Sequence, residues 1–305
     1  MYLSRLSAWR PDEVLSNQDL ARLVDTSDEW IFDHVGIRER RKSPNEMPIH
    51  EQGAQAARQS IDGLDPASID LVVCAFSISD YHIPATANLV AAALGLGGAP
   101  AFDLRAACSS FAFALHALRG IVGSGLHQRA LLVVPEAYTH ATDYKDRNTC
   151  ILWGDASFAC VVSREKPPGL SLEVLDTRIG SKSTDWKLIQ ISNGGYFQQQ
   201  GQAVQRFAIR KMSAIIGEQM RGEPVDWFVG HQANASILSR ACERAGLRPE
   251  QNLTNIEKFG NTGAAGAPTV LADNTSRFKN GERIVVATVG AGLSWGTALL
   301  RAHRG

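Results

Sequence analysis

Three short stretches of this chain carry side chains that could do chemistry together, although they lie far apart in the sequence. They are Asp103-Leu-Arg-Ala-Ala-Cys108, Gly230-His231-Gln-Ala-Asn234 and Phe259-Gly-Asn261-Thr-Gly263. A cysteine thiolate is a strong nucleophile, and imidazole and amide side chains are hydrogen-bonding groups that can act beside it. If the fold brings the three stretches to one pocket, covalent catalysis at the sulfur is the expected chemistry.

Cys108 is predicted to lie where a strand turns into a helix. Residues 99–103 follow a Gly-rich turn and predict a short strand. The run from Ser109 to Gly123 predicts a mostly buried helix, because its apolar residues recur at helical spacing (Phe111, Leu115, Leu118 and Val122). The free N–H groups and positive dipole end of such a helix lower a thiol pKa. A buried cysteine that acts only as a small hydrophobic residue is an equally good interpretation of this stretch alone.

The other two stretches place polar groups where predicted secondary structure changes. His231 follows a strand predicted over residues 225–229, and Asn261 lies in a loop of small residues that opens a helix. Gly290-Ala291-Gly292 follows the last long strand. Ligands of α/β proteins collect at strand ends. Taken singly, a structural histidine and a turn asparagine are the commoner interpretations; together, after matching strands, the residues favour a shared pocket.

The order of signals in the first half of the chain returns in the second half. This indicates an internal duplication, with halves of residues 1–166 and 167–305 that separate at the Pro-containing segment 165–169. We expect two βα-rich halves packed as an α/β/α/β/α body, with Cys108 in the first half and His231 and Asn261 in the second. The matching segments are 69–73 with 225–229, 128–134 with 282–288, and 152–158 with 294–300.

Composition narrows the class of protein. The chain has 305 residues and a formal net charge of zero, so nothing in its charge favours nucleic acid or an anionic membrane as a partner. No apolar run approaches the roughly 20 residues that span a bilayer, and the first residues lack the pattern of a signal peptide. The five cysteines are scattered, so we expect a reducing cytoplasm, no disulfide framework and no metal site.

These residues also carry a family resemblance. Over nearly its whole length the chain resembles β-ketoacyl-acyl-carrier-protein synthase III of the thiolase superfamily, which implies the duplicated five-layer thiolase-like fold. The motifs behind this resemblance are the three stretches above together with Thr26-Ser-Asp-Glu-Trp-Ile31, Gly36-Ile-Arg-Glu-Arg40 and Ser294-Trp-Gly-Thr-Ala-Leu299.

The resemblance implies a decarboxylative condensing enzyme of fatty acid or specialised polyketide-like biosynthesis. Cys108 would take an acyl group from acyl-CoA or an acyl carrier. His231 and Asn261 would hold a malonyl thioester, on the carrier protein or coenzyme A, while it loses CO₂. The main-chain N–H groups of Cys108 and Ala291 would stabilise the oxyanion. No bound cofactor and no metal are implied.

The resemblance further implies how substrates are held. Trp30 and Arg147 would enclose the adenine of coenzyme A, Gly201 and Asn234 would line the pantetheine path, and Arg206 would face the acyl carrier protein. Ile83 would belong to the acyl pocket. A cytoplasmic homodimer is the expected assembly.

Departures from the family pattern keep two alternatives open. His34 and Ala235-Ser236 stand where family members often have cationic residues, and Ser109-Ser110 follow the nucleophile where a glycine is commoner. The first alternative is an acyltransferase of the same fold that works without decarboxylation and uses His231 as a general base. The second is a non-catalytic partner subunit, which the complete Cys–His–Asn set disfavours.

Overall fold

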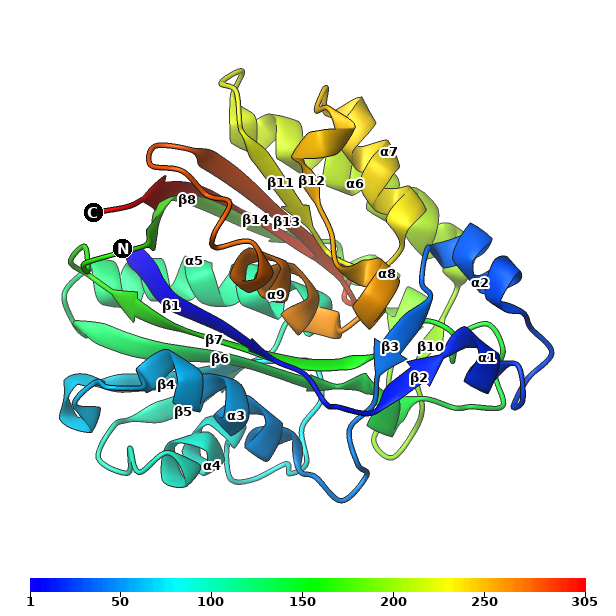
Figure 1. The fold of residues 1–305 in the computed structure, drawn as a ribbon, viewed down its shortest axis with the longest axis horizontal. Coiled ribbons are helices and arrows are strands. Elements are labelled where there is room, and N and C mark those ends of the chain that lie inside the picture. The colour runs from blue at the N-terminus through cyan, green and yellow to red at the C-terminus, as the bar shows by residue number, and fades with distance from the viewer.

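The computed structural model describes all 305 residues (Figure 1). The helices are α1 (Asn17–Leu20), α2 (Asp28–Val35), α3 (Ile49–Ile61), α4 (Thr86–Ala93), α5 (Ser110–Gly123), α6 (Gly201–Met220), α7 (Ala235–Arg244), α8 (Ile256–Phe259) and α9 (Gly266–Asp273). The strands are β1 (Tyr2–Trp9), β2 (Val14–Ser16), β3 (Glu39–Arg41), β4 (Leu71–Ala75), β5 (Ala101–Leu104), β6 (Arg129–Ala137), β7 (Asp155–Ser163), β8 (Ser171–Ser181), β9 (Ile189–Gln190), β10 (Gln198–Gln199), β11 (Trp227–Gly230), β12 (Asn252–Leu253), β13 (Arg283–Gly290) and β14 (Ser294–His303).

The strand order repeats between the two halves of the chain. Ten strands form one mixed sheet in the order β12-β11-β13-β14-β8-β1-β7-β6-β4-β5. Read outward from its centre, the sheet has the order β1-β7-β6-β4-β5 on one side and β8-β14-β13-β11-β12 on the other. The segments that match in sequence therefore occupy matching strands, β4 with β11, β6 with β13, and β7 with β14. The two sides join through a short antiparallel pairing of β1 with β8, for example Leu3 opposite Leu172.

The helices form three layers around these strands. Figure 1 shows α3 and α4 on the outer face of the β6–β7 side, α6 and α7 on the outer face of the β13–β14 side, and α5 and α9 between the two sides. Each helix layer has its own buried apolar cluster against the strands that it covers. The predicted five-layer α/β/α/β/α order is confirmed.

The central helices are apolar because strands cover them on both sides. Phe111, Leu115, Leu118 and Val122 of α5 are all completely buried, as their spacing predicts. On α9, the small residues Gly266 and Ala267 and the apolar residues Val270 and Leu271 are also buried. This central layer is the scaffold that places the nucleophile, because α5 begins two residues after Cys108.

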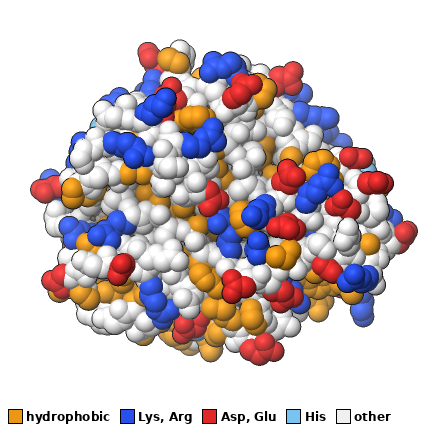
Figure 2. Space-filling view, in the orientation of Figure 1, with side chains coloured by type: hydrophobic (Ala, Val, Ile, Leu, Met, Phe, Trp, Pro, Cys, Tyr) orange, Lys and Arg blue, Asp and Glu red, His pale blue; other side chains and the backbone are white.

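Several boundaries differ from the prediction. The strand expected over residues 99–103 covers Ala101–Leu104, and the strand expected over residues 225–229 covers Trp227–Gly230. The short strand β9 pairs with β10 in a separate two-stranded sheet. No helix is both long enough and apolar enough to cross a membrane. Positive and negative side chains are interspersed over the face seen in Figure 2, in keeping with the zero net charge.

Candidate active site

Cys108 lies in a single 3₁₀ turn, residues 107–109, between β5 and α5. Ala107, directly before it, has φ +48°, a left-handed conformation that costs a residue with a Cβ about 1–2 kcal/mol. The turn is also packed tightly against the end of β13, since a Cβ on Gly290 would lie 2.9 Å from the Cys108 nitrogen. The nucleophile is therefore held by a strained, closely packed backbone at the end of β5.

The predicted low pKa of the Cys108 thiol is wrong. The side chain is buried, with 8% of the residue exposed. Burial, followed by the nearby carboxylate of Glu136, raises the thiol pKa to about 12, against the opposing effect of a hydrogen bond with Tyr138. Desolvation of the thiolate outweighs the helix terminus here. The resting residue is consequently a thiol, and a base must take its proton before it attacks a thioester.

His231 comes directly after β11, as predicted, and its main-chain N–H donates to the Ala287 carbonyl at 2.9 Å. Its ring is buried, and burial lowers its pKa to about 4. The imidazole is therefore neutral at physiological pH, and its Nδ1 has no hydrogen-bond partner within the chain. A neutral ring of this kind can donate one hydrogen bond or accept one proton.

Asn261 is held by a backbone bridge to another segment and by a hydrogen bond within its own loop. It forms an isolated parallel bridge with Trp153. Its Oδ1 accepts a hydrogen bond from the Gly263 N–H at 3.0 Å. Because the oxygen is already used, the Nδ2 hydrogens are the part of the amide left to donate to a ligand.

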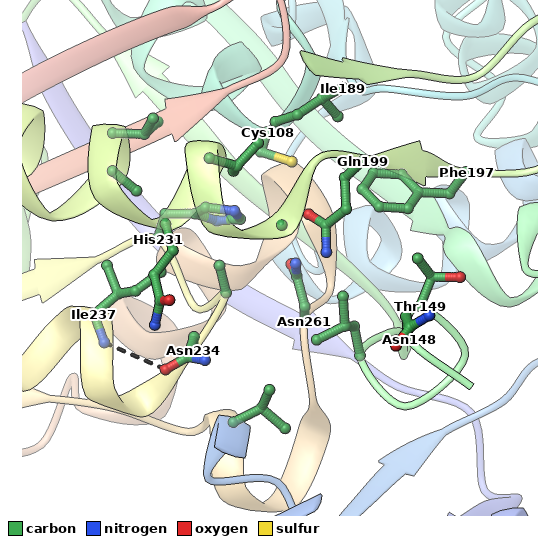
Figure 3. Close-up of a pocket in the computed structure, with 18 of the residues that line it drawn as sticks. Cys108, Asn148, Thr149, Ile189, Phe197, Gln199, His231, Asn234, Ile237 and Asn261 are labelled. Atoms are coloured by element: carbon green, nitrogen blue, oxygen red, sulfur yellow. Dashed lines mark hydrogen bonds between the residues drawn. The ribbon is translucent and has the colours of Figure 1, made fainter. Parts of the chain in front are cut away.

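The three residues line one cavity of about 760 Å³. Figure 3 shows the side chains of Cys108, His231 and Asn261 turned toward the same space, with the amide of Gln199 beside them. The cavity also reaches Trp30, which lies half-buried on α2. Residues from both halves of the chain thus meet in one channel, as the sequence predicted for its three chemical stretches.

Only some of the residues expected to hold coenzyme A or the carrier protein line the cavity. Trp30, Gly201 and Asn234 line the cavity. The Arg147 guanidinium lies 4.8 Å from the centre of the Trp30 ring, so a base can lie between them only after the guanidinium moves away. Arg206 is exposed on α6 and does not line the cavity.

The amide of Asn234 is used by the fold. Its Oδ1 caps α7 by accepting from the Ser236 and Ile237 N–H groups at 2.8 and 3.3 Å. Its Nδ2 donates to the His34 carbonyl at 2.9 Å. An N-cap asparagine of this kind stabilises its helix by about 1 kcal/mol. Asn234 can therefore shape the channel wall, but its hydrogen bonds are already made.

A second cavity, of about 450 Å³, meets the other side of Cys108. Ala291 and Cys108, the two predicted oxyanion residues, both line this cavity. Ile83, expected in the acyl pocket, lines neither cavity of this chain and is 86% exposed. The prediction for Ile83 is therefore wrong for the single chain, because its loop turns this side chain outward to solvent.

Two residues next to the sulfur were missed from the sequence. The Tyr138 hydroxyl lies 3.7 Å from Cys108 Sγ. Glu136 is completely buried, and its Oε1 accepts from the Ser77 hydroxyl at 2.6 Å and from the Ser77 and Ala264 N–H groups. Burial raises the Glu136 pKa to about 8. Glu136 and Tyr138 lie at the end of a buried strand. The same position singled out His231, so it could have identified these two residues from the sequence.

No cluster of three or more His, Cys, Asp or Glu side chains that could hold a metal is found.

Comparison with known proteins agrees with this arrangement. Residues 102–183 match the family 3-oxoacyl-[acyl-carrier-protein] synthase III, and residues 217–302 match the C-terminal part of the same family. A β-ketoacyl-[acyl-carrier-protein] synthase III of Deinococcus radiodurans is 38% identical over 97% of this chain and 93% of its own. Its counterpart in Aquifex aeolicus is 36% identical over 95% and 96%.

Solved structures give the same result. The Aquifex aeolicus 3-oxoacyl-[acyl-carrier-protein] synthase III superposes with a TM-score of 0.93, at 34% identity, over 98% of this chain and 99% of that chain. A priming β-ketosynthase of the R1128 polyketide pathway superposes with a TM-score of 0.91, at 28% identity, over 100% and 97%. The chain therefore belongs to the 3-oxoacyl-[acyl-carrier-protein] synthase III family and is a condensing enzyme of the acyltransferase class with the thiolase-like fold.

Proposed function

We propose that the chain joins an acyl group held on Cys108 to a malonyl-type thioester held by His231 and Asn261. The observation that carries this proposal is the single channel that contains all three side chains and also reaches Trp30. Its volume of about 760 Å³ suits a small-molecule site. A long, flexible thioester arm can enter such a channel with its bulky end left outside.

The first step transfers the acyl group. The neutral imidazole of His231 accepts the thiol proton, and the Cys108 thiolate attacks the carbonyl carbon of the incoming thioester. The main-chain N–H groups of Cys108 and Ala291 donate to the oxyanion. The bond from carbon to the donor sulfur then breaks, and the departing thiolate takes back the proton. Acyl-CoA is the donor that the Trp30 end of the channel favours, since an aromatic side chain can stack on adenine.

The second step forms the carbon–carbon bond. The malonyl thioester oxygen accepts hydrogen bonds from the His231 ring and Asn261 Nδ2. The bond to the carboxylate breaks, CO₂ leaves, and the two donors stabilise the enolate that remains. The enolate carbon attacks the acyl carbon on Cys108, the carbon–sulfur bond to Cys108 breaks, and a 3-oxoacyl thioester leaves. The Cys108 thiolate then takes a proton from water and returns to the resting thiol. All the polar groups needed come from the chain itself, with no bound cofactor.

Two further roles depend on partners outside the channel. Arg206 is exposed beside the channel on α6, where its charge can meet a phosphate or an acidic helix of a carrier protein. A homodimer would cover the exposed loop that carries Tyr81 and Ile83, which are 52% and 86% exposed. Light scattering after gel filtration measures whether the chain is a homodimer. Ile83→Asp is the variant expected to weaken the association.

Two measurements test the proposed reaction. Intact-protein mass spectrometry with a panel of acyl-CoA thioesters should show one acyl adduct, which Cys108→Ala removes and Cys242→Ala retains. The acylated enzyme should then release labelled CO₂ from carboxyl-labelled malonyl thioester and form a 3-oxoacyl product. Acyl transfer without CO₂ release would identify the non-decarboxylating acyltransferase instead, and no adduct with any thioester would contradict catalysis at Cys108.

A further inference from the structure

The Tyr138 hydroxyl is fixed beside the sulfur by its surroundings. The residue is 2% exposed, and its ring stacks on Trp153 with centroids 4.0 Å apart and an interplanar angle of 9°. Phe197 packs edge-on against the same ring. On the other side, Gly263 approaches so closely that a Cβ there would overlap the Tyr138 ring. The hydroxyl therefore has little freedom to leave its position 3.7 Å from Cys108 Sγ.

Tyr138 belongs to the second cavity and not to the channel. An acyl group on Cys108 leaves the channel free for the second thioester only if its chain points into that second cavity. Its first carbons must then pass the Tyr138 hydroxyl. Acylation also turns the sulfur into a thioester sulfur, a weak acceptor, so Tyr138 loses a partner at that moment.

Ser77 does not remove the need for a new partner. Its hydroxyl donates its hydrogen to Glu136 Oε1 at 2.6 Å, and the Tyr138 hydroxyl is paired with Cys108 Sγ. Ser77 therefore has no hydrogen left to donate, and a lone pair of the Tyr138 oxygen stays without a donor. An alkyl chain laid over this oxygen would shield it from water and offer nothing in return. A substrate hydroxyl can donate to it.

The rest of the second cavity has a mixed lining, in which polar side chains stand beside apolar ones such as Ile78 and Phe197. Arg105 lines it, forms no ion pair in the chain, and donates one Nη2 hydrogen to the Ser77 carbonyl at 2.6 Å. His140 is held by the Ser43 hydroxyl at 3.1 Å. The polar lining consists of Ser77, Ser79, Asp80, Tyr81, His82, Arg105, Tyr138, His140, Gln190, Ser192 and Asn193. Walls of this kind suit a short acyl group that carries oxygen better than a long hydrocarbon chain.

We propose that the second cavity selects short acyl groups with a hydroxyl on C3, and that Tyr138 is the residue that recognises this hydroxyl. The inference rests on the proposed function, because it requires Cys108 to be acylated. It goes further by stating the chemical class of the acyl donor.

The test compares two thioesters that differ by one oxygen. The rate of adduct formation on Cys108 is measured by intact-protein mass spectrometry with 3-hydroxybutyryl-CoA and with butyryl-CoA. We expect the hydroxylated donor to react about tenfold faster, the factor that one buried hydrogen bond of about 1.4 kcal/mol gives. Tyr138→Phe should bring the ratio of the two rates close to one. Tyr144→Phe, a tyrosine that lines neither cavity, should leave the ratio unchanged.

Three results would overturn the inference. The first is a ratio of one or less between the wild-type rates with 3-hydroxybutyryl-CoA and with butyryl-CoA. This result would overturn the inference even if Tyr138→Phe fails to fold. The second is a Tyr138→Phe variant that slows both donors by the same factor, because Tyr138 would then act on the sulfur alone. The third is the absence of any Cys108 adduct, which would also overturn the proposed function; an adduct with butyryl-CoA but no preference leaves that function intact.

Discussion

Asn261 is joined to Leu152 through its backbone. The Asn261 N–H donates to the Leu152 carbonyl at 2.8 Å, and the Asn261 carbonyl accepts from the Gly154 N–H at 3.0 Å. Leu152 belongs to the first half of the chain and Asn261 to the second. The amide that faces the nucleophile's channel is thus positioned by main-chain bonds across the two halves, and its side chain can be changed without removing them.

Asn261→Ala should separate the two steps of the reaction. Loss of one donor to a developing oxyanion costs about 3 kcal/mol, so release of CO₂ should fall by about 100-fold. The rate at which Cys108 is acylated should change by less than about threefold. Asn148→Ala, at a residue that lines the same channel, is the matched control for loss of an amide. Equal losses in both steps would contradict a role of Asn261 at the enolate.

Gly290→Ala should inactivate the enzyme through the backbone of the nucleophile. A Cβ at this position would lie 2.9 Å from the Cys108 nitrogen and 3.0 Å from the Ser109 nitrogen, so the turn must shift. Displacement of a reacting group by about 1 Å can reduce rates by about 100-fold, and we expect a loss of this size in the rate of adduct formation.

Gly217→Ala is the control for the same chemical change. Gly217 lies within α6, and nothing would meet its Cβ within 4 Å. An exposed helix interior gains about 0.5–1 kcal/mol from this substitution, so urea unfolding should show a slightly more stable protein with unchanged activity. Full activity of Gly290→Ala would show that the close approach to Cys108 is unimportant.

Arg147→Ala should raise the Michaelis constant for acyl-CoA and leave the turnover number nearly unchanged. The guanidinium lies over Trp30 at the channel and within 3.6 Å of an Asp25 carboxylate oxygen, which is a contact expected to affect binding rather than chemistry. Arg206→Ala should leave the Michaelis constant for acyl-CoA unchanged and raise the Michaelis constant for a malonyl-carrier protein. Steady-state kinetics with each substrate varied in turn measure both constants. If Arg147→Ala affected the carrier protein and Arg206→Ala affected acyl-CoA, the two assignments would have to be exchanged.

Stability should fall in mild acid because of His231. Its pKa is lowered from 6.5 to about 4 by burial, so the unfolded chain binds a proton below about pH 6.5 while the folded chain stays neutral. Acid therefore favours unfolding over this window, by about 3 kcal/mol between pH 6.5 and 4. Urea unfolding of wild type and His231→Phe at several pH values should show a shallower decline for the variant. Parallel declines would mean that the ring is solvated enough to titrate normally.

Local sequence patterns predicted the elements well because their causes are local. The spacing of Phe111, Leu115 and Leu118 predicted a buried helix, and α5 is that helix. The thiol pKa of Cys108 was wrong for the opposite reason. A helix terminus can be read from the neighbouring residues, whereas desolvation comes from strands and loops that are distant in the chain.

The sequence by itself determined the duplicated α/β architecture, the strand-to-helix turn at Cys108, and the placing of His231 after a buried strand. Periodicity, turn residues and repeated order are properties of the chain alone. Only the tertiary structure decided that Tyr138 lies beside the sulfur, that Asn234 already uses its amide in a helix cap, and that Ile83 faces solvent. Those facts depend on which distant segments share a surface, and no pattern within a single segment contains that information.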